Sequence, residues 1–122
     1  MGGGTTRREL FRLAGGLVVG AVGLAVAGEA LDPRSGASLA RSWLRDPATA
    51  IDLGSRYLGV HPEEGDSVFL LERSLGAGSA VGAARRFATL RRREFARGDT
   101  VVLEGWVVSR AEARLCALLA LA

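Results

Sequence analysis

The residues of this sequence that could do chemistry are few, and the densest group surrounds its only histidine. His61 is followed closely by Glu63, Glu64 and Asp66. An imidazole beside carboxylates could serve as an acid–base pair or hold a metal ion. The same residues also fit a helix start, because Pro62 suits a first helical position and the helix dipole favours carboxylates in the first turn. The pattern therefore favours a structural role over catalysis.

Two other residues carry a nucleophilic atom. Ser109 lacks the Gly-x-Ser-x-Gly surroundings of a hydrolase nucleophile, and with Glu112 it forms the Ser-x-x-Glu pattern of a helix capping box. Cys116 is the only cysteine, so it has no intramolecular disulfide partner. Its place on a Leu-rich segment favours a buried, inert thiol, with a disulfide to a second chain as the alternative.

The Gly-rich run over residues 76–82 resembles a phosphate-binding loop only superficially. It lacks the Gly-Lys-Ser/Thr ending of that loop, and no strand is expected before it, so we interpret it as a connector between helices. The sequence also has no cysteine cluster, no histidine pair and no dinucleotide-binding fingerprint. The sequence therefore predicts no catalytic residue, no metal site and no cofactor.

Residues 1–27 have the layout of an export signal, with two arginines ahead of an uncharged stretch that closes on Ala25-Val26-Ala27. Small side chains at Ala25 and Ala27 fit the shallow pockets of a signal peptidase. The run TRRELFR resembles the twin-arginine motif, Ser/Thr-Arg-Arg-x-Phe/Leu-Leu/Phe-Lys/Arg. The residues that match it are Thr6, Arg7, Arg8, Leu10, Phe11 and Arg12. The resemblance implies that the twin-arginine translocase carries the chain, already folded, across the cytoplasmic membrane.

An uncleaved membrane anchor is the alternative use of the same stretch. Residues 13–28 are uncharged and would form a helix of about 24 Å, against a hydrocarbon core of about 30 Å. Five glycines in this span also lower its helix propensity. We therefore expect cleavage before Gly28 and a periplasmic or other extracytoplasmic location, with anchoring in the inner membrane by residues 13–28 as the alternative.

The charge of the chain is unevenly divided. The formal net charge is +3 and the isoelectric point is about 10.4, values common among nucleic-acid-binding proteins. Residues 1–27 hold three arginines and one glutamate, so most of the excess belongs to the expected signal. Net charge therefore does not support nucleic acid as a partner. Every basic residue is arginine, which we interpret mainly as coding bias in a GC-rich genome.

The pattern of caps and apolar residues predicts a mainly α protein: a small bundle of about four helices with one short extended segment before the C-terminal helix. A linker is expected over residues 28–45, with Trp43-Leu44 as its first docking point, and the helical domain over residues 46–122. The expected helices run from Asp46-Pro47 to about Leu58 with Gly59 as the stop, from His61-Pro62 to Gly76 or Gly78, from Ser79 to Arg97 before Gly98, and from Arg110 to the C-terminus.

Several side chains are expected to face inward. In the first two of these helices they are Ile51, Tyr57, Leu58, Val68, Leu71 and Leu75. Residues 101–103 and 106–108 are rich in β-branched and aromatic side chains, which predicts extended chain that is bent or paired at Gly105.

The segment 79–97 has two faces when it is projected as a helix. The apolar arc holds Val81, Ala84, Phe87, Ala88 and Phe95, and the opposite arc holds Arg85, Arg86, Arg92, Arg93 and Arg97. Arg91 intrudes on the apolar arc and is expected to pair with an acid or to extend past its neighbours into solvent. The arginine arc is either a solvated face or a contact surface for anionic lipid or an acidic partner.

Residues 105–118, GWVVSRAEARLCAL, resemble the C-terminal end of small exported bacterial proteins to which no activity is assigned. This resemblance implies one structural unit, in which a strand delivers Trp106 to the core and a capped helix follows.

Folded export without a cofactor site leaves two explanations: fast folding, or travel with a larger cofactor-bearing subunit. The functional hypothesis is a non-enzymatic accessory protein or small subunit of a periplasmic or membrane-surface complex, with an oxidoreductase as the expected partner class. A small exported enzyme using His61 with Glu63 or Glu64 and an uncleaved, membrane-anchored protein are the alternatives.

Overall fold

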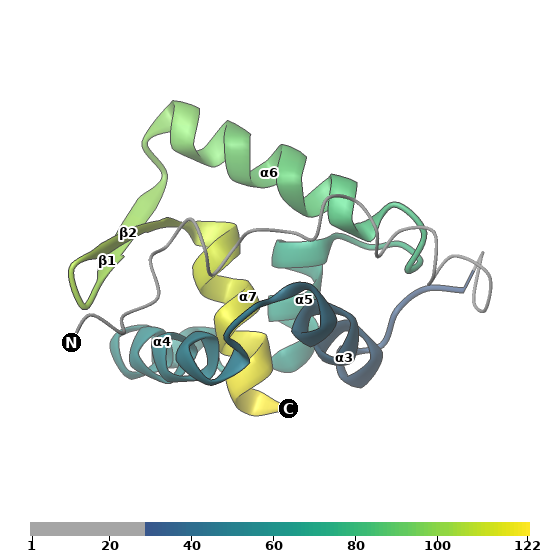
Figure 1. Ribbon diagram of the computed structural model, residues 1–122, viewed down its shortest axis with the longest axis horizontal. Coiled ribbons are helices and arrows are strands. Elements are labelled where there is room, and N and C mark those ends of the chain that lie inside the picture. Colours follow the sequence, from purple (N-terminus) through teal and green to yellow (C-terminus); the bar gives the residue numbers. More distant parts are fainter. Residues whose placement is uncertain (1–28) are drawn as a thin grey trace.

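The C-terminal helix is the centre of the fold. In the computed structural model, residues 29–122 are described, and within them α7 (Arg110–Leu121) contacts all four other α-helices. Figure 1 shows α7 in yellow at the middle of the molecule, with α6 on one side and α3, α4 and α5 on the other. The remaining elements are α3 (Pro33–Trp43), α4 (Pro47–Val60), the 3-10 helix η1 (Pro62–Glu64), α5 (Ser67–Leu75), α6 (Ala83–Arg97), β1 (Thr100–Leu103) and β2 (Trp106–Ser109).

Local caps set where the helices begin. The side chains of Asp32, Asp46 and Asp66 each accept a hydrogen bond from a backbone N–H in the first turn of α3, α4 and α5. Proline follows two of these caps, and its fixed φ is already helical. Ser109 and Glu112 form the expected capping box at the start of α7. Each of these helix starts is therefore determined by residues that lie within one helical turn of it.

The hydrophobic core is centred on α7, and apolar side chains of the other helices pack around it. Eight of its residues are buried, and they meet apolar side chains from every other helix. The largest fully buried side chains in the described part of the chain are Tyr57, Phe87, Leu70, Leu75, Leu115, Leu118 and Leu119. Burying this apolar surface stabilises the domain, and it fixes the positions from which polar groups on α7 reach the other helices.

Helix α4 approaches α7 closely at Gly54. A Cβ atom at this position would overlap the backbone carbonyl of Cys116 and lie 2.6 Å from the nitrogen of Ala117. Only glycine allows the two backbones to come this near. This approach places the C-terminal turn of α4 beside α7.

A two-residue hairpin joins α6 to α7. β1 pairs antiparallel with β2, with Val101 opposite Val108 and Leu103 opposite Trp106. The turn residues Glu104 and Gly105 both have positive φ, 53° and 82°, as the right-handed twist of a tight hairpin requires. The prediction of paired, extended chain bending at Gly105 is confirmed.

The predicted fold class is confirmed: the protein is mainly helical, with a short two-stranded sheet before the last helix. The prediction of a linker over residues 28–45 is wrong, because residues 33–43 form α3 and pack on the core. Asp32-Pro33 is the same start signal as Asp46-Pro47, so the sequence did carry this helix. Trp43 and Leu44 are buried, as the expected docking point.

Three predicted helix boundaries are wrong. Residues 62–64 form a separate 3-10 turn and α5 begins only at Ser67, because Asp66 caps that helix. α4 continues through Gly59 to Val60. α6 begins at Ala83, after Gly82 with a φ of 81°, so residues 79–82 form a turn. Its predicted end is confirmed, since Gly98 takes the left-handed conformation with a φ of 72°.

Most of the predicted inward side chains are buried or pack against the core. Tyr57, Leu71 and Leu75 are buried, and Ile51 and Leu58 pack partly against the core. Two predicted apolar contacts are wrong: Val68 is 52% exposed, and Val81, in the turn before α6, is 44% exposed. On α6, Phe87 is fully buried, while Ala84, Ala88 and Phe95 are half-buried. Trp106 is only half-buried, and Val108 is the β2 side chain that enters the core.

Within residues 29–122 no helix has the length and apolar character needed to cross a membrane. The twin-arginine motif, the cleavage residues Ala25 and Ala27 and the alternative anchor over residues 13–28 lie outside the described residues. The export signal therefore stays a prediction from the sequence.

Candidate functional site

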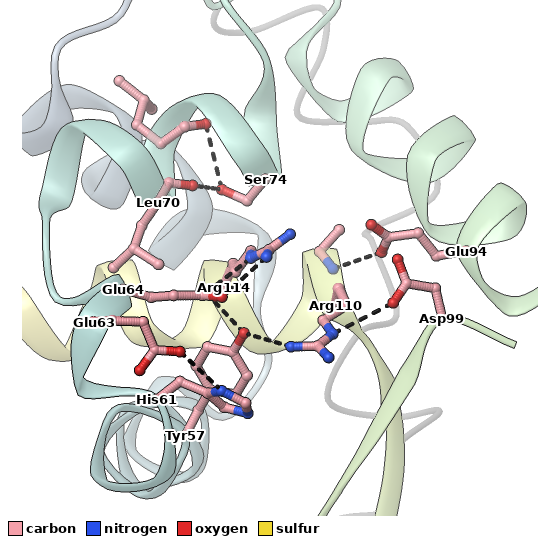
Figure 2. A network of polar contacts seen from close by, with 12 residues as sticks. Tyr57, His61, Glu63, Glu64, Leu70, Ser74, Glu94, Asp99, Arg110 and Arg114 are labelled. Atoms are coloured by element: carbon pink, nitrogen blue, oxygen red, sulfur yellow. Dashed lines mark hydrogen bonds and ion pairs between the residues drawn. The ribbon is translucent and has the colours of Figure 1, made fainter.

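A partly buried polar network lies where α4, η1 and α7 meet, and it extends to the more exposed Asp99 ahead of β1 (Figure 2). The Glu64 carboxylate accepts hydrogen bonds from the Tyr57 hydroxyl at 2.7 Å and from Nε and Nη2 of Arg114 at 2.9 and 3.0 Å. Arg110 Nη1 donates to the Tyr57 hydroxyl at 3.3 Å, and Arg110 Nε donates to Asp99 at 3.3 Å. We call these residues, Tyr57, Glu64, Asp99, Arg110 and Arg114, the Tyr–Glu–Arg network.

The charges of this network hold one another in their ionised forms. The hydrogen bonds from Arg114 lower the pKa of Glu64, and the same bonds raise the pKa of Arg114. Burial raises the pKa of Tyr57, so its hydroxyl stays protonated and donates to the carboxylate. A bidentate arginine–carboxylate pair is among the stronger polar contacts in proteins. The network therefore joins η1 to α7 and stabilises their packing.

The structure brings His61, Glu63 and Glu64 together, but Glu64 binds Tyr57 and Arg114, whereas Glu63 contacts His61. Ligand atoms of His61, Glu63 and Glu64 lie within 4.8 Å of one another, and His61 Nδ1 is 3.4 Å from Glu63. However, the oxygens of Glu64 are engaged by Tyr57 and Arg114, and the guanidinium would repel a second cation. The trio is therefore a poor metal site.

The remaining members of the predicted acid–base group are placed in local structure. The His61 ring packs on the Tyr57 ring with centroids 4.6 Å apart, and the His61 backbone caps α4. Asp66 accepts hydrogen bonds from the backbone N–H groups of Val68 and Phe69 at the start of α5. Both residues therefore have structural roles, as the sequence favoured, but the capping role of Asp66 was not predicted, because the helix was expected to begin at Pro62.

Two more carboxylates are buried at the N-terminus of α7. Glu94, only 4% exposed, reaches from α6 and accepts a hydrogen bond of 2.6 Å from the backbone N–H of Ala111. Glu112, fully buried, accepts from the backbone N–H of Ser109 at 2.8 Å. The positive end of the α7 dipole favours both anions. Burial nevertheless raises the pKa of Glu94, so its charge is held at a cost.

Arg91 is a cation that pairs with one of these two acids, Glu112. Its Nη1 lies 3.6 Å from Glu112 Oε2, and its guanidinium lies over the Phe87 ring, 5.9 Å from the centroid. The prediction that Arg91 pairs with an acid is confirmed.

Neither nucleophilic side chain is available at the surface. Ser109 is fully buried, and its hydroxyl accepts from the Glu112 N–H at 3.1 Å, as the capping box requires. Cys116 is 1% exposed, and burial raises the pKa of its thiol far above the usual range. The buried-thiol prediction is confirmed, and a disulfide to a second chain would require α7 to leave the core.

One member of the predicted arginine arc has a different task. Arg86 donates to the backbone carbonyls of Leu75 at 2.8 Å, Ser79 at 2.7 Å and Val81 at 3.1 Å. A Cβ at Gly78 would lie 2.8 Å from its guanidinium carbon, so the Gly-rich connector leaves room for this arginine. Including Arg86 in a free contact face is therefore wrong. Arg85, Arg92, Arg93 and Arg97 are exposed, as predicted.

An open groove of about 490 Å³ lies beside α3. Its lining is Leu31, Arg34, Ser35, Ser38, Leu39, Ser42 and Ala80. This lining offers one cation and three hydroxyls but no carboxylate or imidazole. The residues of the Tyr–Glu–Arg network are not part of it, so the polar network and this groove are separate features.

Sequence reasoning missed the Tyr–Glu–Arg network and Glu94. Glu64 and Arg114 are fifty residues apart, and Tyr57 was expected only as an apolar contact. Nothing in local spacing signals such a pair, because the partners meet only through the packing of η1 against α7. Comparison of the chain with protein-family models, curated proteins and solved structures found no match in any of the three.

Proposed function

We propose that this protein is an exported, non-enzymatic accessory protein or small subunit of a complex in the periplasm or at the membrane surface. One observation supports this most: the only histidine–carboxylate cluster of the described chain is occupied by internal bonds, with Glu64 held by Tyr57 and Arg114. A carboxylate locked in an ion pair is a poor general base, because its pKa is lowered. The cluster therefore stabilises the fold.

An oxidoreductase is the partner class that we propose. The twin-arginine route carries folded cargo, and its motif resemblance at Arg7-Arg8 precedes a domain with locally capped helices. A small domain that folds before export can travel with, or later join, a larger cofactor-bearing subunit. The alternative location, anchoring by residues 13–28, would place the same domain at the membrane surface.

The export part is tested by replacing both Arg7 and Arg8 with lysine. Cell fractionation should find the wild-type chain outside the cytoplasm, shortened to start at Gly28, and the double variant retained inside at full length. An extracytoplasmic double variant would overturn the twin-arginine assignment. A wild-type chain that stays full length in the membrane fraction would favour the anchored alternative.

The accessory role is tested by purifying the chain from periplasmic extract at low ionic strength. We expect co-purification with a larger, cofactor-bearing protein and a complex of defined mass. A monomer without a partner under these conditions would overturn the proposal. An activity that His61→Ala abolishes while the circular dichroism spectrum is retained would instead favour the small exported enzyme.

A further inference from the structure

Helix α6 is held rigidly at both ends. At its N-terminus, Arg86 binds the carbonyls of Leu75, Ser79 and Val81. Near its C-terminus, Glu94 accepts the N–H of Ala111, which ties the last turns to α7. Figure 1 shows α6 along the outer edge of the molecule, with the other helices on one side of it. Its outer surface is therefore presented on a fixed element.

That outer surface is a stripe of arginines. Arg85, Arg92, Arg93 and Arg97 are exposed, and they form no hydrogen bond or ion pair with any residue in the described range 29–122. Arg85 and Arg97 are twelve residues apart, about 18 Å along the helix. The one acid of the helix, Glu94, is buried on the opposite side. We call these four residues the arginine stripe.

The stability of the helix accounts for only part of the stripe. A cation in the last turn of a helix is favoured by the dipole, which explains Arg97. Arg85 is the third residue of α6, next to the positive end of the same dipole. The first turn contains no acidic residue, and Gly82 supplies no side-chain cap. A cation at Arg85 therefore opposes the helix dipole, and this first turn would be more stable with an acid.

We propose that the arginine stripe is the docking surface for an acidic surface of a protein partner, an inference that rests on the proposed accessory role. Four exposed guanidinium groups on one fixed helix can pair with carboxylates, which arginine binds through two parallel hydrogen bonds. The stripe extends to Arg85, where folding alone disfavours a cation. A residue that opposes local stability is typical of a functional surface.

The composition of the stripe favours a protein over a bilayer. A helix that lies in a membrane interface buries large apolar side chains among the lipids. Two large apolar residues of α6, Phe87 and Leu90, instead pack against the core of this domain, and Phe95 is half-buried. Between the exposed arginines lie only small residues, Thr89 and Ala96. Only an electrostatic contact with lipid would remain, without the apolar burial that holds an interfacial helix in a bilayer.

The binding test uses the full chain and a synthetic helical peptide with glutamates at positions i, i+7, i+8 and i+12. Titration calorimetry should show binding that weakens as salt is raised, and at least tenfold weaker binding by the triple variant R85Q/R92Q/R93Q. The matched control is R34Q/R41Q/R45Q, which removes three other exposed arginines and the same charge. Equal loss in both variants, or no binding to the wild type, would overturn the proposal.

Two further probes distinguish an acidic protein surface from other ligands of the arginine stripe. The same peptide with glutamine in place of glutamate should not bind. Vesicles containing phosphatidylglycerol test the lipid alternative, and vesicle binding that R85Q/R92Q/R93Q abolishes, without peptide binding, would overturn docking on a protein. Vesicle binding that survives in that variant belongs to another part of the chain.

Arg85 gives the sharpest test, because its effects on stability and binding should have opposite signs. Arg85→Glu should raise the melting temperature by about 2–4 °C, since an acid in the first turn suits the dipole, and should weaken peptide binding at least tenfold. A variant that loses stability, or binds unchanged, would contradict the inference. If the periplasmic complex forms equally well with R85Q/R92Q/R93Q, the accessory role stands and the docking surface is wrong. If the peptide binds to the arginine stripe but no periplasmic complex is found, the docking surface stands and the accessory role is wrong.

Discussion

Arg114 of α7 and Glu64 of η1 are fifty residues apart in the sequence and are joined by two hydrogen bonds of 2.9 and 3.0 Å. Their side chains are 15% and 11% exposed, so the pair is nearly removed from water. Tyr57 adds a third hydrogen bond to the same carboxylate from α4. The carboxylate of Glu64 thereby joins α4, η1 and α7, and the effect of removing its hydrogen bonds on stability can be measured.

We expect Arg114→Met to destabilise the protein by about 3 kcal/mol, because it leaves the buried Glu64 charge without its cation. Denaturant unfolding measures the change in the free energy of unfolding. The control is Arg56→Met, which breaks exposed ion pairs with Asp52 and Glu104 and should destabilise the protein much less than Arg114→Met does. The double variant E64L/R114M should cost less than the sum of its single changes, and strict additivity would contradict a direct pair.

The buried carboxylates predict opposite pH effects. Burial raises the pKa of Glu94 above the ordinary value of a glutamate, about 4.5, so its contribution to stability is complete below that pH and is lost as pH rises through the folded pKa. Arg114 lowers the pKa of Glu64, so the contribution of Glu64 to stability is present above the ordinary value of about 4.5 and is lost as pH falls through the folded pKa.

The Glu94 effect is measured with Glu94→Gln, which keeps an acceptor for the N–H of Ala111. Unfolding free energies of the wild type and the variant are compared between pH 4 and pH 8. Relative to Glu94→Gln, the wild type should become less stable as pH rises above about 4.5. A difference between them that does not change with pH would show that Glu94 does not titrate with folding.

Two arginines of the same helix should differ in their effect on stability. Arg86→Met removes the donor to three backbone carbonyls and should cost about 1–3 kcal/mol, because those acceptors lose a charged partner. Arg92→Met changes an exposed side chain and should stay within about 0.5 kcal/mol. Thermal unfolding of both variants measures the difference, and equal effects would mean that the carbonyl contacts are unimportant.

Two glycines of α4 form a second matched pair. Gly54→Ala should destabilise the protein by about 3 kcal/mol or more, the upper end of the cost of an overpacking substitution in a core. The reason is that the new Cβ would overlap the backbone of α7. Gly59→Ala places its Cβ in open space, so it should stabilise the helix by about 0.5–1 kcal/mol. Denaturant unfolding of the two variants decides whether α4 and α7 approach as closely as described.

The thiol of Cys116 should be unreactive in the folded protein. It is 1% exposed, so reaction with a thiol reagent needs α7 to open, and the rate should be at least about a hundredfold lower than in denaturant. Absorbance after addition of an aromatic disulfide reagent measures both rates. A dimer on a non-reducing gel of the native protein would contradict the buried position.

The sequence predicted the features whose partners lie within one helical turn. Asp46 before Pro47, the Ser109–Glu112 box and Gly98 each satisfy backbone groups three or four residues away, so their residue types alone indicate a helix end. The same rule explains why α3 could have been found from Asp32 and Pro33. It also explains the error after His61, where Pro62 begins only a 3-10 turn because the stronger cap, Asp66, follows.

The sequence by itself determined the helical class, the hairpin, the buried thiol and the expectation of export, because each depends on local pattern or composition. Only the tertiary structure decided which polar groups meet. Arg85 and Arg86 are adjacent and identical in type, yet one is exposed and the other binds the carbonyls of Leu75, Ser79 and Val81. Glu64 likewise finds Arg114 only when η1 packs against α7. Such pairings depend on helix packing in three dimensions, which spacing along the chain does not encode.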